Sequence, residues 1–177
     1  TLAPEAGSER LRRVINKGIS EEALLATVAM ALRAGIPNVK LYIMIGLPEE
    51  TDADIEAIRT LALKTLQCMR ENGPAGTLTL SVNPFVPKPF TPFQWLPMAN
   101  QNLVAARLKK LEKSLKTEKR IRVQAESLRE AYIQGALARG DHRLGGALLA
   151  AQQLGGRKHW KQALKLTGLQ EEDYLYR

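Results

Sequence analysis

A short segment with alternating polar side chains is the first place where this chain could bind a ligand. Residues 77–83 read TLTLSVN, and this strict alternation predicts a β-strand with one aliphatic and one polar face. The polar side chains are Thr77, Thr79, Ser81 and Asn83. Hydroxyl and amide groups can both donate and accept hydrogen bonds. The inward face of such a strand meets either a packed interior or a ligand, and Thr79, Ser81 and Asn83 predict an interior that is polar near its top.

An apolar segment that ends abruptly gives a second candidate. Residues 39–45 are apolar except for Lys40, and the chain continues as Gly46, Leu47, Pro48 and Glu49. So continuous an apolar segment predicts a parallel strand buried on both faces. Ligands of α/β proteins gather at the carboxyl ends of such strands. The same alternation places three residues on the inward face: Tyr42, Met44 and Gly46.

Residues that could act as metal ligands or nucleophiles are few. Cys68 is the single cysteine, and the chain has two histidines. This count excludes a disulfide framework and any metal site made of cysteine and histidine within the chain. Cys68 lies beside Met69 on a predicted helix, and we interpret it as inert packing.

The elements that must position these residues alternate between helix and strand. Ser20 is expected to cap a helix that Gly35 ends, and Thr51 with Asp54 forms a capping pair that starts another helix directly after the strand. Alternating elements of this length make right-handed βαβ units. About two and a half such units fit before residue 84, whereas a complete barrel needs about 250 residues. The sequence therefore predicts an α/β fold with a partial (βα) barrel.

Charge divides the chain into two parts. Residues 1–97 contain ten basic and ten acidic residues, whereas residues 98–177 contain sixteen and eight, so the net charge of +8 lies in the second part. Between them, residues 83–97 (NPFVPKPFTPFQWLP) hold five of the nine prolines and all three phenylalanines. We expect an ordered loop packed on the domain here. The predicted domains are residues 1–97 and a basic, mainly helical extension at 98–177.

Composition sets the general class. Of the 177 residues, 45% are hydrophobic and 25% are charged, which fits a globular chain with a core. No apolar stretch approaches the roughly 20 residues that a membrane helix needs, and no secretory signal begins the sequence. We expect no membrane partner and a cytoplasmic location. The sequence begins at Thr1 without an initiator Met, so we expect a piece of a longer protein.

Three motifs together resemble a known family. They are APEAGSERLRRVINKG (3–18), LYIMIGLPEET (41–51) and NPFVPKPFTPFQW (83–95). In this order they resemble the C-terminal half of the radical S-adenosylmethionine (radical SAM) core, most closely the group with an added cobalamin-binding-like domain upstream. The resemblance covers residues 1–97, and REAYIQGALARGDHR (129–143) also resembles that group. It implies an enzyme that cleaves S-adenosylmethionine (SAM) reductively and forms a 5'-deoxyadenosyl radical.

The resemblance gives roles to individual residues. Glu5 and Ser8 correspond to polar groups that contact the ribose and amino group of SAM, and Lys17 stands where the family often has an arginine that meets the methionine carboxylate. Lys keeps the charge but lacks the bidentate fork of Arg. The other residues implied to line the cosubstrate pocket are Tyr42 and Met44 beside the adenosine, Gly46 for close backbone approach, and Phe85 and Val86 flanking the adenine.

The cluster motif of this family is absent from the chain. The family binds a [4Fe-4S] cluster through three cysteines spaced CxxxCxxC, and no such motif occurs here. The resemblance therefore implies that the cluster ligands lie upstream in the same protein, that cobalamin would bind an upstream domain, and that these 177 residues alone are inactive. We assign no catalytic and no metal-binding residue within the chain.

Plainer interpretations of the same residues stay open. Glu5 could be an ordinary surface carboxylate, Lys17 a solvated cation at a helix end, and Tyr42 and Met44 plain core. Between residues 107 and 122 there are eight basic and two acidic residues. The alternative function is a non-catalytic RNA- or protein-binding module with a basic helical tail. Clustered cations could contact RNA phosphates, although no aromatic residues interleave with them for stacking on bases. RNA is not the favoured partner, because a solvated helix face, or a face docked on an upstream domain, is the commoner explanation of such a cluster.

Overall fold

The computed structural model describes residues 1–74 and 76–176, which form two compact units. Unit 1 comprises residues 1–84 and 102–126, and unit 2 comprises residues 85–101 and 127–177. Each unit has its own core and is described by itself below.

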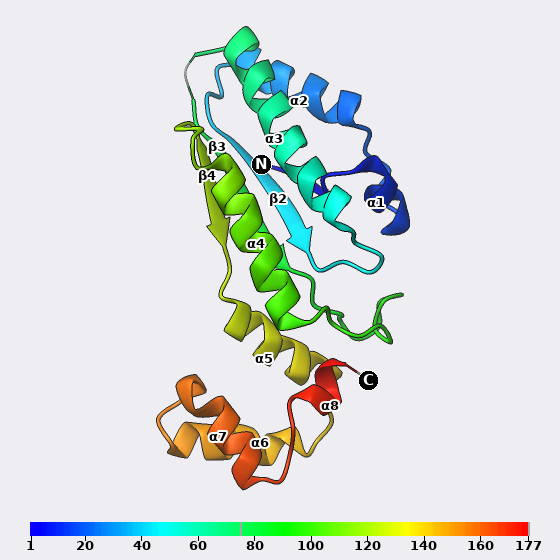
Figure 1. The fold of residues 1–177 in the computed structure, drawn as a ribbon, viewed down its shortest axis with the longest axis vertical. Helices are drawn as coiled ribbons and strands as arrows, with labels where there is room; N and C mark the ends of the chain where they lie inside the picture. The colour runs from blue at the N-terminus through cyan, green and yellow to red at the C-terminus, as the bar shows by residue number, and fades with distance from the viewer. Residues whose placement is uncertain (75, 177) are drawn as a thin grey trace. The chain divides into compact units, whose positions relative to one another are not determined.

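A four-stranded parallel sheet is the centre of unit 1 (Figure 1). Its strands are β1 (Leu2–Glu5), β2 (Val39–Ile45), β3 (Leu78–Pro84) and β4 (Ile121–Ala125), and they lie side by side in the order β1-β2-β3-β4. Sequential order in a parallel sheet is the result of successive right-handed βαβ crossovers. The predicted α/β fold is confirmed, and the sheet is open at β1 and β4 within the described residues.

Side-chain caps mark the starts of the first three of the four helices that unit 1 has in the described residues. These helices are α1 (Glu9–Val14), α2 (Glu21–Arg33), α3 (Asp52–Asn72) and α4 (Gln101–Leu115). Ser20 caps α2 by accepting a hydrogen bond from the amide of Ala23. Thr51 and Asp54 form the expected capping box of α3, in which each side chain accepts a hydrogen bond from the other's backbone amide. Local sequence thus fixed both helix starts.

Alternation along the strands separates a buried face of the sheet from a half-exposed one. On β2, Leu41, Ile43 and Ile45 are buried, whereas Tyr42 is 39% exposed. The register pairs Tyr42 with Ser81 on β3, and the three polar residues of β3 are likewise only half-buried. The predicted alternation is confirmed: the aliphatic side chains of both strands share the buried face, and Tyr42 and the polar side chains share the other. The expectation that both faces of β2 are covered is not met within the described residues, because the helical layer packs only on the aliphatic face.

The fourth strand lies in a region that was expected to be mainly helical. After β3 the chain leaves unit 1, returns as α4, and then adds β4 parallel to β3, with Leu78 opposite Ile121 and Val82 opposite Ala125. Residues 102–126 therefore belong to unit 1, and the compact units do not follow the predicted boundary at residue 97. Only Ile121 of β4 is buried, so the local sequence signal for this strand is weak.

Unit 2 consists of short helices around a separate core. The helices are α5 (Leu128–Arg139), α6 (Leu144–Gln153), η1 (Arg157–His159), α7 (Trp160–Leu166) and α8 (Glu172–Leu175). Trp160, Tyr132 and Leu175 are among the buried residues of this core. The Tyr132 hydroxyl donates a hydrogen bond to the carbonyl of Ala99, which ties the segment after the proline-rich loop to α5.

The proline-rich loop is ordered by turns but only partly packed. The amide of Phe90 donates to the Gln94 side chain at 3.1 Å. Phe85 is buried, whereas Phe90 is 98% and Trp95 81% exposed. The expectation that its aromatic residues pack on the domain is therefore wrong for these two side chains within the described residues. Composition alone cannot distinguish buried from displayed aromatic rings.

None of the helices in the described residues is long and apolar enough to cross a membrane.

Candidate functional site

Two loops of unit 1 leave the sheet at its carboxyl edge. Because β1 and β2 are parallel neighbours, the residues that follow Glu5 and Ile45 leave the sheet at the same edge. Ligand sites of α/β folds form at this edge, where loops provide side chains and helix N-termini point toward the ligand. These two loops therefore form the candidate site.

Glu5 and Lys17 form a charged pair at this edge. The Nζ atom of Lys17 lies 3.4 Å from Oε1 of Glu5, and both side chains remain partly accessible. Glu5 has a φ of 66°, which places a non-glycine residue in the left-handed region. Such conformations cost free energy and cluster at functional sites. The structure thus brings together two residues that the sequence assigned to different parts of one ligand.

Ser8 contributes to a buried hydrogen-bond network around Asp54. Its hydroxyl caps α1 by accepting from the amide of Leu11 at 3.1 Å, and it donates to Oδ1 of Asp54. Oδ2 of Asp54 accepts from Arg10 at 2.5 Å and from the backbone amide of Thr51 at 2.8 Å. Ser8 therefore connects the β1–α1 loop to the start of α3 and has both its donor and its acceptor engaged.

Electrostatics in this network favour a charged carboxylate. Asp54 is only 3% exposed, and burial alone would raise its pKa. The hydrogen bonds from Arg10, Ser8 and Thr51 outweigh this effect and hold the pKa of Asp54 well below its usual range. The carboxylate is therefore charged at neutral pH, which favours its hydrogen bonds from Arg10, Ser8 and Thr51.

Close packing fixes the loop that carries Glu5. A Cβ atom on Gly7 would lie 2.2 Å from the backbone nitrogen of Ile58 in α3, so only glycine allows this approach. The buried guanidinium of Arg12 donates to the carbonyls of Ala6 at 2.9 Å and Gly7 at 3.1 Å. Burial lowers the pKa of Arg12. The β1–α1 loop is therefore held from both sides.

The loop after β2 is organised by a buried ion pair. Gly46 has a φ of 81°, and its amide donates to both carboxylate oxygens of Glu50 at 3.0 Å. Nη1 of Arg107 on α4 lies 2.9 Å from Oε1 of Glu50. Burial raises the pKa of Glu50 despite the opposing effects of the Gly46 amide and Arg107. Gly46 is required for the turn, and its amide is engaged by Glu50.

Tyr42 and Met44 lie on the half-exposed face of the sheet, as the alternation predicted. The ammonium of Lys40 lies 5.8 Å from the centre of the Tyr42 ring, which is within the range of a cation–π contact. The neighbouring strand places Ser81 opposite Tyr42 and Asn83 opposite Met44. This face can offer hydroxyl, amide and thioether groups to a ligand.

Phe85 and Val86 belong to unit 2. The Phe85 ring packs edge-on against Phe93, with ring centres 5.9 Å apart. Val86 packs against the core of unit 2. Their predicted contact with an adenine therefore stays a sequence-based prediction, and the site in unit 1 is described without them.

The described residues do not provide a metal site. Within residues 1–74 and 76–176, no group of three or more His, Cys, Asp or Glu side chains could hold a metal ion. Cys68 is half-buried, and burial raises the pKa of its thiol. Its position on α3 agrees with the interpretation as packing.

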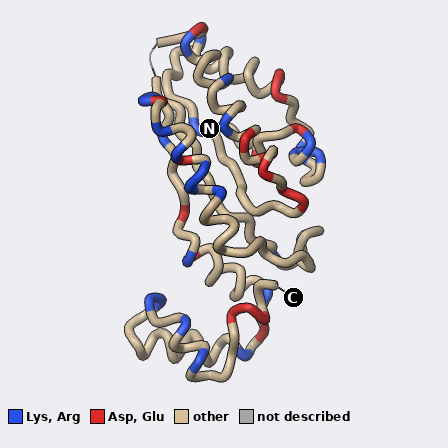
Figure 2. Tube along the Cα trace, in the orientation of Figure 1, with Lys and Arg blue, Asp and Glu red and all other residues tan. Residues whose placement is uncertain are grey.

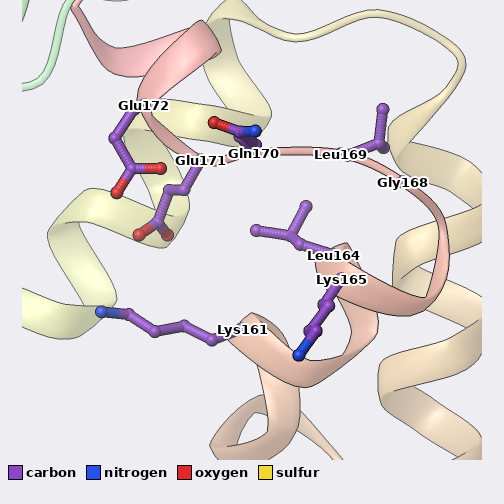
Figure 3. Close-up of a pocket in the computed structure, with 8 residues that line it drawn as sticks. All are labelled: Lys161, Leu164, Lys165, Gly168, Leu169, Gln170, Glu171 and Glu172. Carbon is purple, nitrogen blue, oxygen red and sulfur yellow. The ribbon is translucent and has the colours of Figure 1, made fainter.

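Two hollows lie elsewhere on the two units. A groove of 590 Å³ between α2 and α3 of unit 1 is lined by residues that include Glu22 and Cys68. In unit 2, Lys161 and Lys165 border a hollow of 390 Å³, with Glu171 and Glu172 among its other lining residues (Figure 3). Neither hollow includes a residue that the sequence assigned to the ligand.

Sequence reasoning missed the residues that hold the site in place. Arg10, Arg12 and Arg107 each make long-range or buried contacts that no local pattern announces. Asp54 was expected only as a helix-capping residue, and its contact with Arg10 joins positions 44 residues apart. One signal for these contacts is present in the sequence: polar residues are concentrated in PEAGSER (4–10) and PEETDAD (48–54).

The fold and the site define an α/β protein with a charged pair and ordered loops at the carboxyl edge of a parallel sheet. The family model of the radical SAM superfamily matches residues 1–62, which include β1, β2 and the start of α3. The chain is also 41% identical over 145 residues to an uncharacterized protein of Methanocaldococcus jannaschii. That match covers 81% of this chain and 30% of the relative, so the chain spans less than a third of the relative's length. No solved structure matches the chain.

Proposed function

We propose that this chain forms part of the SAM-binding core of a radical SAM enzyme. The observation that carries the proposal is the match of the superfamily model to residues 1–62, because this segment contains the Glu5–Lys17 pair and the loop after β2. When bound with a reduced [4Fe-4S] cluster, SAM supplies a 5'-deoxyadenosyl radical that removes a hydrogen atom from a substrate.

Glu5 and Lys17 fit the amino-acid end of SAM. The methionine portion carries one ammonium and one carboxylate, and the pair offers one carboxylate and one ammonium. Both side chains are partly accessible, so each could exchange part of its present contact for a ligand contact. Holding Glu5 at a φ of 66° costs free energy that a functional role would explain.

The remaining residues receive different roles in the proposal. Tyr42 and Met44 present a half-exposed surface for the adenosine. Gly46, which has no side chain, allows the adenosine to approach the backbone closely at the turn. Ser8 acts as a positioning residue through Asp54, because its hydroxyl is already engaged. Phe85 and Val86 are retained as adenine contacts on the sequence resemblance alone.

The cluster requires residues outside this chain. Cys68 is the single cysteine in the sequence and lies on α3, so the chain does not fit a three-cysteine ligand set. We propose that the cluster cysteines precede Thr1 in a longer cytoplasmic protein, that the sheet continues beyond β1 as a partial barrel, and that this chain alone is inactive. An upstream cobalamin-binding domain belongs to the same proposal and rests on sequence resemblance.

Glu5→Gly offers the sharpest test. Glycine adopts a positive φ without strain, so this variant should be at least as stable as the parent. In the longer protein, reconstituted anaerobically with iron and sulfide and then reduced, we expect it to lose SAM binding and 5'-deoxyadenosine formation. Lys17→Gln should weaken SAM binding, because it removes the cation expected to meet the methionine carboxylate.

Glu56→Gln is the matched control, because Glu56 is an exposed carboxylate on α3 that pairs with Arg59. It should leave both cluster content and product unchanged. A well-folded protein that binds no cluster and forms no 5'-deoxyadenosine would contradict the enzyme proposal. Full activity of Glu5→Gly would instead contradict only the role of Glu5.

A further inference from the structure

Unit 1 carries a cationic surface that the proposed SAM site does not use. We define the cationic face as Lys109, Lys110 and Lys113 on α4, and Lys116, Lys119 and Arg120 in the α4–β4 turn. All six side chains are exposed, and Figure 2 shows basic residues along α4 and the turn. Within the described residues, none of the six forms a salt bridge.

Helical periodicity explains why these cations face solvent. Val104, Leu111 and Leu115 form the buried stripe of α4. At 100° per residue, Lys109 and Lys113 lie roughly opposite that stripe. Arg107 lies on a different side of the helix and pairs with Glu50, so it is not part of the cationic face.

The turn between α4 and β4 holds its cations in a defined arrangement. The amide of Glu118 donates to the carbonyl of Leu115 at 3.0 Å, and the amide of Ile121 donates to the carbonyl of Glu118 at 2.9 Å. The carbonyl of Arg120 accepts from the amide of Leu78 at the start of β3. The acidic residue of the turn, Glu118, is engaged by Arg70 of α3 at 3.3 Å. The backbone of the turn is therefore ordered, and the acidic residue of the turn pairs with Arg70 instead of with the cations of the turn.

The chemistry of the cationic face fits a phosphodiester backbone better than a protein partner. Five of its six members are lysines, and residues 101–126 contain no aromatic side chain. Protein interfaces are depleted in lysine and enriched in aromatic residues, whereas lysines supply the salt-dependent, sequence-independent part of nucleic-acid binding. Without aromatic side chains, stacking on bases is not provided. We propose that the cationic face binds the phosphate backbone of a nucleic acid without reading its sequence.

This surface is separate from the candidate site. α4 runs from the carboxyl edge of the sheet back to its amino edge, where the turn leads into β4. Glu5 ends β1 at the carboxyl edge. The cationic face would therefore anchor a nucleic acid and not hold the group that reacts. Its test is independent of SAM chemistry.

The dependence of binding on salt measures the number of phosphate contacts. Duplex RNA, duplex DNA, single-stranded RNA and polyglutamate are the probes, and the dissociation constant is followed by fluorescence anisotropy between about 50 and 200 mM salt. The test variant combines Lys109→Gln, Lys113→Gln and Lys116→Gln. Glutamine has a helix propensity close to that of lysine, so α4 should be retained.

The control variant removes the same charge from unit 2. It combines Lys158→Gln, Lys161→Gln and Lys165→Gln, which are three exposed lysines outside the cationic face. Both variants lower the net charge by the same amount. A difference between them therefore reports on position and not on total charge.

Loss of three phosphate contacts should reduce the slope of log affinity against log salt by about 2.7 for a duplex or about 2.1 for a single strand. A fourfold rise in salt weakens duplex binding by a certain factor in each protein. This factor should be about 40 times smaller for the test variant than for the parent. The control should keep the parental slope. Equal changes in both variants, salt-independent binding, or no binding would overturn the proposal. If polyglutamate bound as tightly as the nucleic acids and lost as much affinity in the test variant, that result would assign the cationic face to an acidic protein instead.

Discussion

The buried carboxylate of Asp54 gives the sharpest prediction for stability. Replacing Asp54 by alanine removes the acceptor for Ser8, Arg10 and Thr51 and abolishes the capping box of α3. Because Arg10 is itself 46% exposed and can be hydrated after the substitution, the loss is that of the helix cap and of the hydrogen bonds to a charged group, about 2–3 kcal/mol. Since whole domains are stable by about 5–15 kcal/mol, this is a large part of the total.

Chemical unfolding measures this loss directly. With a urea dependence of about 2 kcal/mol per molar, the midpoint monitored by circular dichroism should fall by about 1 M. Asp54→Asn should cost less, because the amide keeps the shape and one acceptor but loses the charge. Asp52→Ala is the matched control: it lies in the same helical turn but is 72% exposed and pairs only with Arg107. An equal effect of the Asp52 and Asp54 variants would refute the proposed network.

The network also predicts a dependence on pH. Because the folded-state pKa of Asp54 is lowered, its contribution is fully present above its unfolded pKa of about 4 and is lost as the pH falls toward the folded-state pKa. The difference in unfolding free energy between the parent and Asp54→Asn should therefore be constant near neutral pH and shrink in acid. If this difference in unfolding free energy increased in acid, the proposed stabilisation by a charged Asp54 would be refuted.

Two further variants probe the loops around the site. Gly7→Ala should destabilise the chain by at least about 1–3 kcal/mol because α3 must move, whereas Gly18→Ala, which meets no atom within 4 Å, should be nearly neutral in thermal unfolding. Arg107→Ala should cost about 3–5 kcal/mol at neutral pH by leaving Glu50 buried without its cation. Because the pKa of Glu50 is already raised, this cost should decrease as the pH falls and the carboxyl group becomes protonated; a loss that does not vary with pH would contradict this account.

Local patterns in the sequence predicted much of the sheet and helix framework. The bounds of β2 follow from a continuous apolar segment, and the start of α3 follows from Thr51 and Asp54. Short-range rules suffice here because strand alternation and helix capping depend on residues within a few positions of one another. The inward parity of Tyr42 and Met44 was predictable for the same reason.

Tertiary structure alone decided which charges meet. Glu50 and Arg107 are 57 residues apart, and their pairing follows from the return of the chain as α4. β4 became a strand because β3 offered a free edge beside it, although only one of its five residues is buried. Sequence by itself determined β2, β3, α2 and α3 and the residue types available for a ligand. Only folding decided that Lys17 would contact Glu5 and that Ser8 would be occupied by Asp54, because such contacts depend on distances between segments that no local pattern encodes.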